Sequence, residues 1–152
     1  MPIKDAYPLL RIDELFSTLL NAYCFVRLDL RRGYQQISIR EQGIPQTAFI
    51  THNGLYVVNV MPFWLWNAPA TFHRLMDGIF RHQIGKDVEA YLEHLLMYPV
   101  RHGEMLPILE RTLGHLLDAG LQCKPRKWQV FSDSIHYLGQ IIKDGKIAAD
   151  RS

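Results

Sequence analysis

The sequence is poor in cysteine, in net charge and in long apolar stretches, and each shortage excludes a class of protein. Its 152 residues include two cysteines and carry a formal charge of +2. Cys24 and Cys123 follow no metal-binding spacing and lie in apolar runs, which predicts buried free thiols in a reducing compartment. No run reaches the ~18 apolar residues of a membrane span, and residues 1–10 do not resemble a secretion signal. We therefore expect an intracellular protein, cytoplasmic or nuclear, that is not secreted and has no membrane partner.

The remaining composition is that of a globular protein. Hydrophobic residues make up 48% of the chain and charged residues 21%. A chain of this length can bury most of one core, so we expect a single domain over residues 1–152, or one large piece of a bigger domain. A charge of +2 does not by itself indicate a nucleic-acid partner.

Apolar residues at helical spacing predict three amphipathic helices. The three segments cover residues 11–22, 70–83 and 103–119. The inward face predicted for the last segment consists of five leucines: Leu106, Leu109, Leu113, Leu116 and Leu117. Gly120 follows this segment in the position of a C-terminal helix cap.

Short β-rich runs between these segments predict strands. The runs cover residues 23–30, 34–40, 47–51, 56–60, 88–92, 95–98, 121–124, 128–131 and 136–142. Asn53 and Gly54 form a strong turn signal between two of the runs, and a polar pair joins the runs of residues 88–98 into a second hairpin. The order of helices and hairpins predicts an α+β fold with a layer of helices on one face of an antiparallel sheet.

Two polar features interrupt this apolar pattern. Asp29 lies near the end of an apolar strand, where a carboxylate is costly unless it is paired or bound to a metal. Tyr91-Leu92-Glu93-His94 forms the tip of the second hairpin. Taken alone, Asp29 could cap a turn near Arg31 and Arg32, and the hairpin tip could be a solvated turn.

Seven ordered segments together carry a resemblance to a known family. They are YPLLRIDELF, RLDLRRGYQQISI, IPQTAF, GLYVVNVMPF, NAPATFHRLM, YLEHLLMY and LDAGLQCKPRKWQVFSDSIHYLGQII. In this order and spacing the chain resembles, nearly end to end, the reverse transcriptase of gypsy-type long-terminal-repeat retrotransposons. The resemblance implies an RNA-directed DNA polymerase fragment with a palm-like antiparallel sheet, partial fingers and the start of the thumb from about residue 121.

The resemblance also implies two Mg²⁺ ions held by three aspartates, one on a central strand and two at the tip of a hairpin. Mg²⁺ favours compact oxygen ligands in octahedral geometry. Asp29 matches the first aspartate, whereas Glu93 and His94 stand at the second and third positions. We therefore expect Mg²⁺ binding by Asp29 and Glu93 to be weak or absent. The loss of a catalytic carboxylate predicts that nucleotide addition is slower by about three or more powers of ten. We therefore expect an inactive polymerase.

Four further residues match positions that contact the nucleotide in the family: Leu30, Tyr34, Phe63 and Trp64. The aromatic ring at Tyr34 is expected beneath the incoming sugar, where it would exclude a 2′-hydroxyl. The weaker alternative is an ordinary strand aromatic. After Phe63 the family's Gly-Leu-Thr has become Trp64-Leu65-Trp66. Glycine lets the backbone approach a ligand closely, so an indole at Trp64 is expected to fill that space.

Positions that contact the RNA/DNA template-primer in the family are occupied by basic residues and by one glycine-containing turn. The basic residues are Arg31, Arg32, Lys124, Arg126 and Lys127. Leu138-Gly139 resembles the turn that holds the primer end, although it also suits a strand with a glycine bulge. If the basic residues cluster, binding should be weak, independent of sequence and sensitive to salt.

These observations leave three hypotheses open. The chain is a palm fragment that has lost catalysis, either as a remnant or as a domesticated scaffold. Alternatively, Asp29 and Glu93 hold one metal and retain weak polymerase activity, for instance with Mn²⁺, or the chain binds nucleic acid without chemistry. A transition-metal site of Glu93 and His94 with other histidines lacks the expected ligand spacing. A palm without its surroundings would also leave apolar edges uncovered, which predicts marginal stability or self-association.

Overall fold

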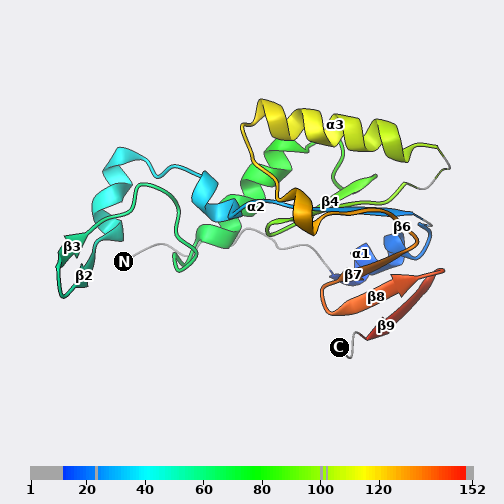
Figure 1. The fold of residues 1–152 in the computed structure, drawn as a ribbon, viewed down its shortest axis with the longest axis horizontal. Helices are drawn as coiled ribbons and strands as arrows, with labels where there is room; N and C mark the ends of the chain where they lie inside the picture. The colour runs from blue at the N-terminus through cyan, green and yellow to red at the C-terminus, as the bar shows by residue number, and fades with distance from the viewer. Residues whose placement is uncertain (1–11, 23, 100, 102, 150–152) are drawn as a thin grey trace.

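The computed structural model describes residues 12–22, 24–99, 101 and 103–149 (Figure 1). Its α-helices are α1 (Ile12–Leu19), α2 (Ala68–Ile79) and α3 (Met105–Asp118). Its 3₁₀ helices are η1 (Gly33–Gln36), η2 (Glu41–Thr47) and η3 (Pro125–Lys127). Its strands are β1 (Phe25–Asp29), β2 (Phe49–Thr51), β3 (Gly54–Tyr56), β4 (Val88–Tyr91), β5 (His94–Met97), β6 (Gln129–Ser132), β7 (Ser134–Tyr137), β8 (Gln140–Lys143) and β9 (Lys146–Ala149).

The centre of the fold is a four-stranded sheet in the order β4-β5-β1-β6. Strand β1 is antiparallel to both of its neighbours, and its register pairs Asp29 with His94. The apolar run that predicted a buried strand is confirmed, because Phe25, Val26 and Leu28 are fully buried. The hairpin predicted over residues 88–98 is confirmed as β4 and β5. The α+β class with an antiparallel sheet is therefore confirmed.

Helices α2 and α3 cover one face of the central sheet, as predicted (Figure 1). Buried side chains of both helices, such as Phe72 and Ile108, share a core with residues of β1, β4 and β5. Helix α1 differs from the expectation of a single helical layer. It packs with β7 and β8 on the other face, where Leu19 joins Phe25 and Ile135. The strands are buried on both faces because this second, smaller core exists.

The second core contains a buried carboxyl group. Glu89 on β4 is 5% exposed, and its Oε1 accepts a hydrogen bond from the hydroxyl of Tyr98 at 3.0 Å. Burial raises the pKa of Glu89 more than the hydrogen bonds from Tyr98 and the backbone of Gly85 lower it. Burial and the nearby Glu89 likewise raise the pKa of Tyr137 above its ordinary value. The folded protein therefore binds a proton on Glu89 more tightly than an exposed glutamate would.

The predicted inward face of α3 was partly wrong. Leu106 and Leu117 are 65% and 80% exposed, whereas the buried residues of the helix are Met105, Ile108, Thr112 and Leu116. The helix has more apolar residues than its contact face needs, so periodicity alone could not identify which of them are buried. Its predicted end is confirmed. Gly120 has a φ of 69°, and its N–H donates to the carbonyl of Leu117 in a left-handed cap.

The strand predicted over residues 34–40 was wrong in its first half. Residues Gly33–Gln36 form η1, which follows Arg32 in the left-handed region at a φ of 50°. The side-chain amide of Gln36 donates to the carbonyls of Arg31 and Gln122 at 2.7 Å and 3.0 Å. These side-chain hydrogen bonds, one within the segment and one to a distant residue, replace a strand ladder. Extended pairing begins only at Ile37, whose carbonyl accepts from the N–H of Met61 at 2.8 Å.

The hairpin predicted around Asn53 and Gly54 is confirmed but shorter than expected. Strands β2 and β3 pair Thr51 with Gly54, so the turn consists of His52 and Asn53. The Thr51 hydroxyl stabilises this turn by accepting from the N–H of Asn53 at 3.2 Å. Figure 1 shows the hairpin at the end of the molecule opposite β8 and β9. It forms a separate two-stranded sheet.

The C-terminal strands were predicted only in part. Residues 128–131 largely coincide with β6, but residues 121–124 contribute only an isolated bridge between Leu30 and Cys123. The single strand predicted over residues 136–142 is instead the end of β7, a two-residue turn and the start of β8. Leu138 and Gly139 both have positive φ, at 51° and 75°, which turns the chain back on itself.

The two cysteines are unpaired, as predicted, but they are half-buried and not fully buried. Desolvation raises the pKa of both Cys24 and Cys123, so neither is an activated thiol. None of the helices in the described part of the chain has the length and hydropathy needed to cross a bilayer.

Candidate active site

The end of β1 and the tip of the β4–β5 hairpin meet at one edge of the central sheet. The N–H of Leu30 donates to the carbonyl of Glu93 at 2.8 Å, and Asp29 lies opposite His94 in the register. The hairpin turns over two residues because Leu92 adopts a left-handed conformation, with a φ of 51°. Antiparallel pairing therefore brings together all three residues that the sequence placed at catalytic positions.

Asp29 is buried and has a nitrogen group near each carboxylate oxygen, although its Oδ2 has no hydrogen-bond partner among the described residues. Its side chain is 6% exposed, and Oδ1 lies 2.8 Å from Nδ1 of His94. Its Oδ2 lies 3.6 Å from Nε of Arg27, and the guanidinium of Arg27 donates in turn to the carbonyl of His136 at 2.7 Å. Because Nδ1 of His94 and Nε of Arg27 make no hydrogen bond in the described part of the chain, these two contacts offset the burial of the carboxylate only in part.

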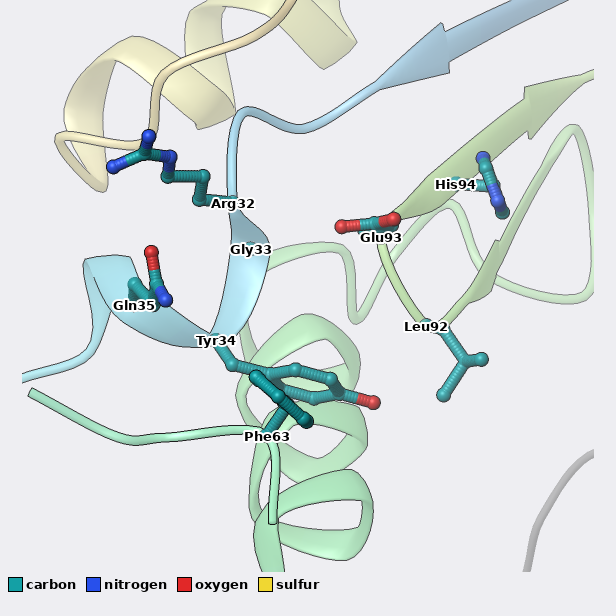
Figure 2. Close-up of a pocket in the computed structure, with 8 residues that line it drawn as sticks. All are labelled: Arg32, Gly33, Tyr34, Gln35, Phe63, Leu92, Glu93 and His94. Atoms are coloured by element: carbon teal, nitrogen blue, oxygen red, sulfur yellow. The ribbon is translucent and has the colours of Figure 1, made fainter.

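Glu93 is exposed and lies on the other side of the hairpin tip. Figure 2 shows its carboxylate pointing toward the segment of Arg32 and Gly33, whereas the ring of His94 points away from that segment. A Cβ added to Gly33 would lie 3.2 Å from Cβ of Glu93 and 3.0 Å from the ring of Phe72. Glycine at this position thus allows the backbone after β1 to approach the hairpin closely.

These side chains do not fit a pair of magnesium ions. Mg²⁺ prefers oxygen ligands, and the two-metal arrangement needs carboxylates that both ions can share. Here Asp29 faces the nitrogen groups of His94 and Arg27, which leaves Glu93 as the only other carboxylate at the tip. Among the described residues, no group of three or more histidine, cysteine or acidic side chains is placed to hold a metal ion.

A pocket of about 540 Å³ opens beside the hairpin tip (Figure 2). Its lining residues are Arg32, Gly33, Tyr34, Gln35, Phe63, Leu92, Glu93 and His94. The ring of Tyr34 lies edge-on to Phe72 with centroids 5.1 Å apart, and burial followed by the charge of Glu93 raises the pKa of its hydroxyl. The pocket thus has aromatic walls and an acidic edge.

Two of the predicted nucleotide contacts lie outside this pocket. Leu30 is 2% exposed and belongs to the core beneath α2 and α3. Trp64 is not part of the lining and is 55% exposed. The indole packs against Phe49 and Phe63 on the outer surface, so it does not fill this pocket, and the expectation that it fills the nucleotide space stays a prediction.

Four of the five predicted basic contacts surround one hollow of about 650 Å³. Arg31, Arg32, Lys124 and Arg126 line it together with Cys123 and Pro125. The N–H of Lys124 donates to the carbonyl of Asp29 at 2.7 Å, which fixes this segment against the end of β1. Lys127 is exposed on η3 but does not contribute to the lining.

Leu138 and Gly139 lie away from the pocket, in the turn between β7 and β8. Leu138 packs against the second core. The same hairpin is nevertheless connected to the candidate site through the hydrogen bond from Arg27 to the carbonyl of His136. Arg27 and Gln36 are the residues that the sequence did not single out. The available signal for Arg27 was its charge within an apolar strand, because a charged side chain there needs a partner.

Comparisons with known proteins agree with this geometry. A family model described as reverse transcriptase (RNA-dependent DNA polymerase) matches residues 3–142. The chain belongs to the reverse transcriptase family. The Pol polyprotein of the transposon opus from Drosophila melanogaster is 36% identical over 97% of this chain. That of the transposon gypsy from the same species is 33% identical over 94% of it. The predicted gypsy-type relationship is confirmed.

The matches also show how much of a larger protein the chain represents. It covers 15% of the opus polyprotein and 14% of the gypsy polyprotein. The RNA-directed DNA polymerase homolog of Oenothera berteroana is shorter, with 41% identity over 64% of this chain and 69% of its own length.

A solved structure of the foamy viral protease-reverse transcriptase in complex with RNA/DNA hybrid aligns with a TM-score of 0.85. The two sequences are 20% identical, and the alignment covers 95% of this chain and 20% of the viral chain. This likeness supports the palm-like reverse transcriptase fold.

Proposed function

We propose that this reverse transcriptase-like domain of a retrotransposon polyprotein has kept a surface for template-primer and lost nucleotide addition. The observation that carries the proposal is the contact of 2.8 Å between Asp29 and His94. We assign the central sheet to the palm, and the chain from about residue 121 to the start of the thumb.

The substitutions at the hairpin tip act in two ways. Histidine at position 94 removes one carboxylate from the site. Its ring also lies against Oδ1 of the surviving Asp29, where a metal ion would otherwise bind. Glu93 keeps a carboxylate but carries it one methylene further from the backbone than aspartate would. The loss of one electrostatic group from a catalytic site costs about 3–4 kcal/mol of transition-state stabilisation, or two to three powers of ten in rate. Two coupled losses make turnover negligible.

The retained nucleic-acid surface is the hollow lined by Arg31, Arg32, Lys124 and Arg126. These side chains are exposed, so they can exchange counterions for backbone phosphates. Lys127 on η3 extends the same basic segment. The foamy viral protein was solved with RNA/DNA hybrid and also with double-stranded DNA. We propose the same class of partner, template-primer duplex, for this chain.

A second candidate function is weak polymerase activity with one metal held by Asp29 and Glu93. The position of Glu93 on the pocket that also contains Tyr34 favours it. Mn²⁺ tolerates imperfect ligand sets better than Mg²⁺ in general, so any such activity should be stronger with Mn²⁺.

Primer extension on an RNA template with Mg²⁺ or Mn²⁺ tests both functions. We expect no incorporation above that of the Asp29→Ala variant with either ion. Binding of the same duplex, measured by fluorescence anisotropy, should persist and should weaken as salt rises. Incorporation that disappears in Asp29→Ala would refute the loss of catalysis and establish the second function.

Two further properties belong to the same proposal. The unpaired thiols of Cys24 and Cys123 suit a reducing compartment inside the cell. Exposed apolar side chains such as Ile50 and Leu117, at 84% and 80%, favour self-association of the chain by itself. Sedimentation velocity over a concentration series should show oligomers, and a monomer at every concentration would contradict this part.

A further inference from the structure

Four aromatic rings form a continuous exposed row on the surface beside the pocket, and we call this row the aromatic ladder. It consists of Phe49, Tyr56, Trp64 and Phe63. The centroid of the Phe49 ring lies 5.9 Å from that of Tyr56 and 6.2 Å from that of Trp64. The rings of Trp64 and Phe63 lie 5.5 Å apart. The four residues are 40%, 47%, 55% and 69% exposed in the order given.

Packing within the β2–β3 hairpin explains only half of this row. Phe49 and Tyr56 are directly opposite in the antiparallel pair, and their stacked rings stabilise a hairpin that would be marginal alone. Phe63 and Trp64 come from the loop between β3 and α2. Their rings meet edge-to-face at 80° and remain in water, although ordinary core formation would bury them.

The aromatic ladder is continuous with the basic hollow. Phe63 is its last ring and also lines the pocket together with Arg32. Arg32 in turn lines the basic hollow with Arg31, Lys124 and Arg126. Glu93 is the only acidic residue in the linings of the pocket and the hollow. A ligand on the aromatic ladder therefore lies next to a surface that attracts anions.

We propose that the aromatic ladder is a stacking platform for the unpaired bases of a single-stranded nucleic acid, whose phosphates continue along the basic hollow. Exposed aromatic faces next to a basic groove are the combination by which proteins bind single strands without sequence preference. The proposal extends the proposed template-primer function by adding a site for a strand that is not base-paired.

Fluorescence anisotropy of a labelled single strand of about 20 nucleotides and of the matching duplex tests this proposal. We expect Trp64→Ala to weaken binding of the single strand by about fivefold or more while changing duplex binding by less than about twofold. Trp64→Leu should weaken single-strand binding nearly as much, since it keeps apolar surface but loses the stacking ring. Leu117→Ala removes an even more exposed apolar side chain from α3 and should change neither affinity.

An Arg31→Ala, Arg126→Ala double variant separates this proposal from the proposed function. It should weaken both single-strand and duplex binding and reduce their dependence on salt. If it does so while Trp64→Ala has no selective effect, template-primer binding stands and the stacking platform is refuted. If neither nucleic acid binds the unchanged protein, both proposals fail. If Trp64→Ala instead converts an oligomer to a monomer without affecting single-strand binding, the aromatic ladder is a self-association surface and the platform is refuted.

Discussion

Replacing His94 by aspartate would put a second carboxylate beside Asp29, where the imidazole now lies 2.8 Å from Oδ1. At an effective dielectric constant of about 20, two like charges about 3 Å apart repel by roughly 5 kcal/mol. The His94 side chain is 33% exposed, so solvent screens part of this energy. We expect His94→Asp to lower the free energy of unfolding by about 2–3 kcal/mol in the absence of divalent ions.

The same variant should gain a stabilising response to divalent ions. Two facing carboxylates supply the oxygen ligands that Mg²⁺ prefers. The imidazole ring that now contacts Oδ1 of Asp29 would be absent. If Mg²⁺ binds the folded variant with a Kd of about 0.1 mM, about 10 mM Mg²⁺ would restore roughly 2.7 kcal/mol. The unchanged protein should show almost no such response, because its buried carboxylate is already paired.

Urea unfolding followed by tryptophan fluorescence, with and without about 10 mM Mg²⁺, measures both effects. Glu93→Gln is the matched control, since it removes an exposed charge from the same hairpin without changing the partner of Asp29. Stabilisation of the unchanged protein by Mg²⁺ as large as that of His94→Asp would refute the reasoning. So would a His94→Asp variant that loses no stability.

Three further predictions concern the fold. Gly33→Ala should cost about 1–3 kcal/mol in urea unfolding, because the added methyl meets an aromatic ring of α2 at 3.0 Å, whereas Gly78→Ala has open space and should be neutral or stabilising. The raised pKa of Glu89 means that the folded state binds a proton more tightly than the unfolded chain. Stability should therefore fall as pH rises from the ordinary glutamate range through the raised value, and Glu89→Gln should flatten this profile. In thermal melts, Leu116→Ala should cost about 2–4 kcal/mol and Leu117→Ala less than about 0.5 kcal/mol, since only Leu116 is buried.

The parts of the fold that the sequence predicted are those with strong local periodicity. Helix α2 and the β4–β5 hairpin follow directly from apolar spacing and a two-residue polar turn. Antiparallel pairing then places the end of β1 beside the hairpin tip, with Asp29 opposite His94 and Glu93 next to them in the turn. Family resemblance supplied the reason to examine these three residues together.

The parts that were not predicted depend on contacts between distant residues. Gln36 holds η1 by bonding the backbone of Gln122, which lies 86 positions later, and no local pattern encodes that partner. The buried stripe of α3 depends on where the helix meets the sheet, so Leu117 could not be told from Leu116 by spacing alone. The position of Trp64 outside the pocket depends on the rings of Phe49 and Phe63, which the sequence did not indicate as its neighbours.

The pairing of Asp29 with His94 explains how this fold can persist without a metal ion. A buried carboxylate without a partner costs several kcal/mol, and in a working two-metal site the cations provide the compensating charge. Here Nδ1 of His94 lies 2.8 Å from Oδ1 of Asp29, at a distance from which it can take over part of that structural role. Under the proposed function, histidine at position 94 would both remove a metal ligand and reduce the need of the buried Asp29 for a cation. The proposed loss of catalysis therefore would not have to destabilise the domain, and the basic hollow and the aromatic ladder would stay in place.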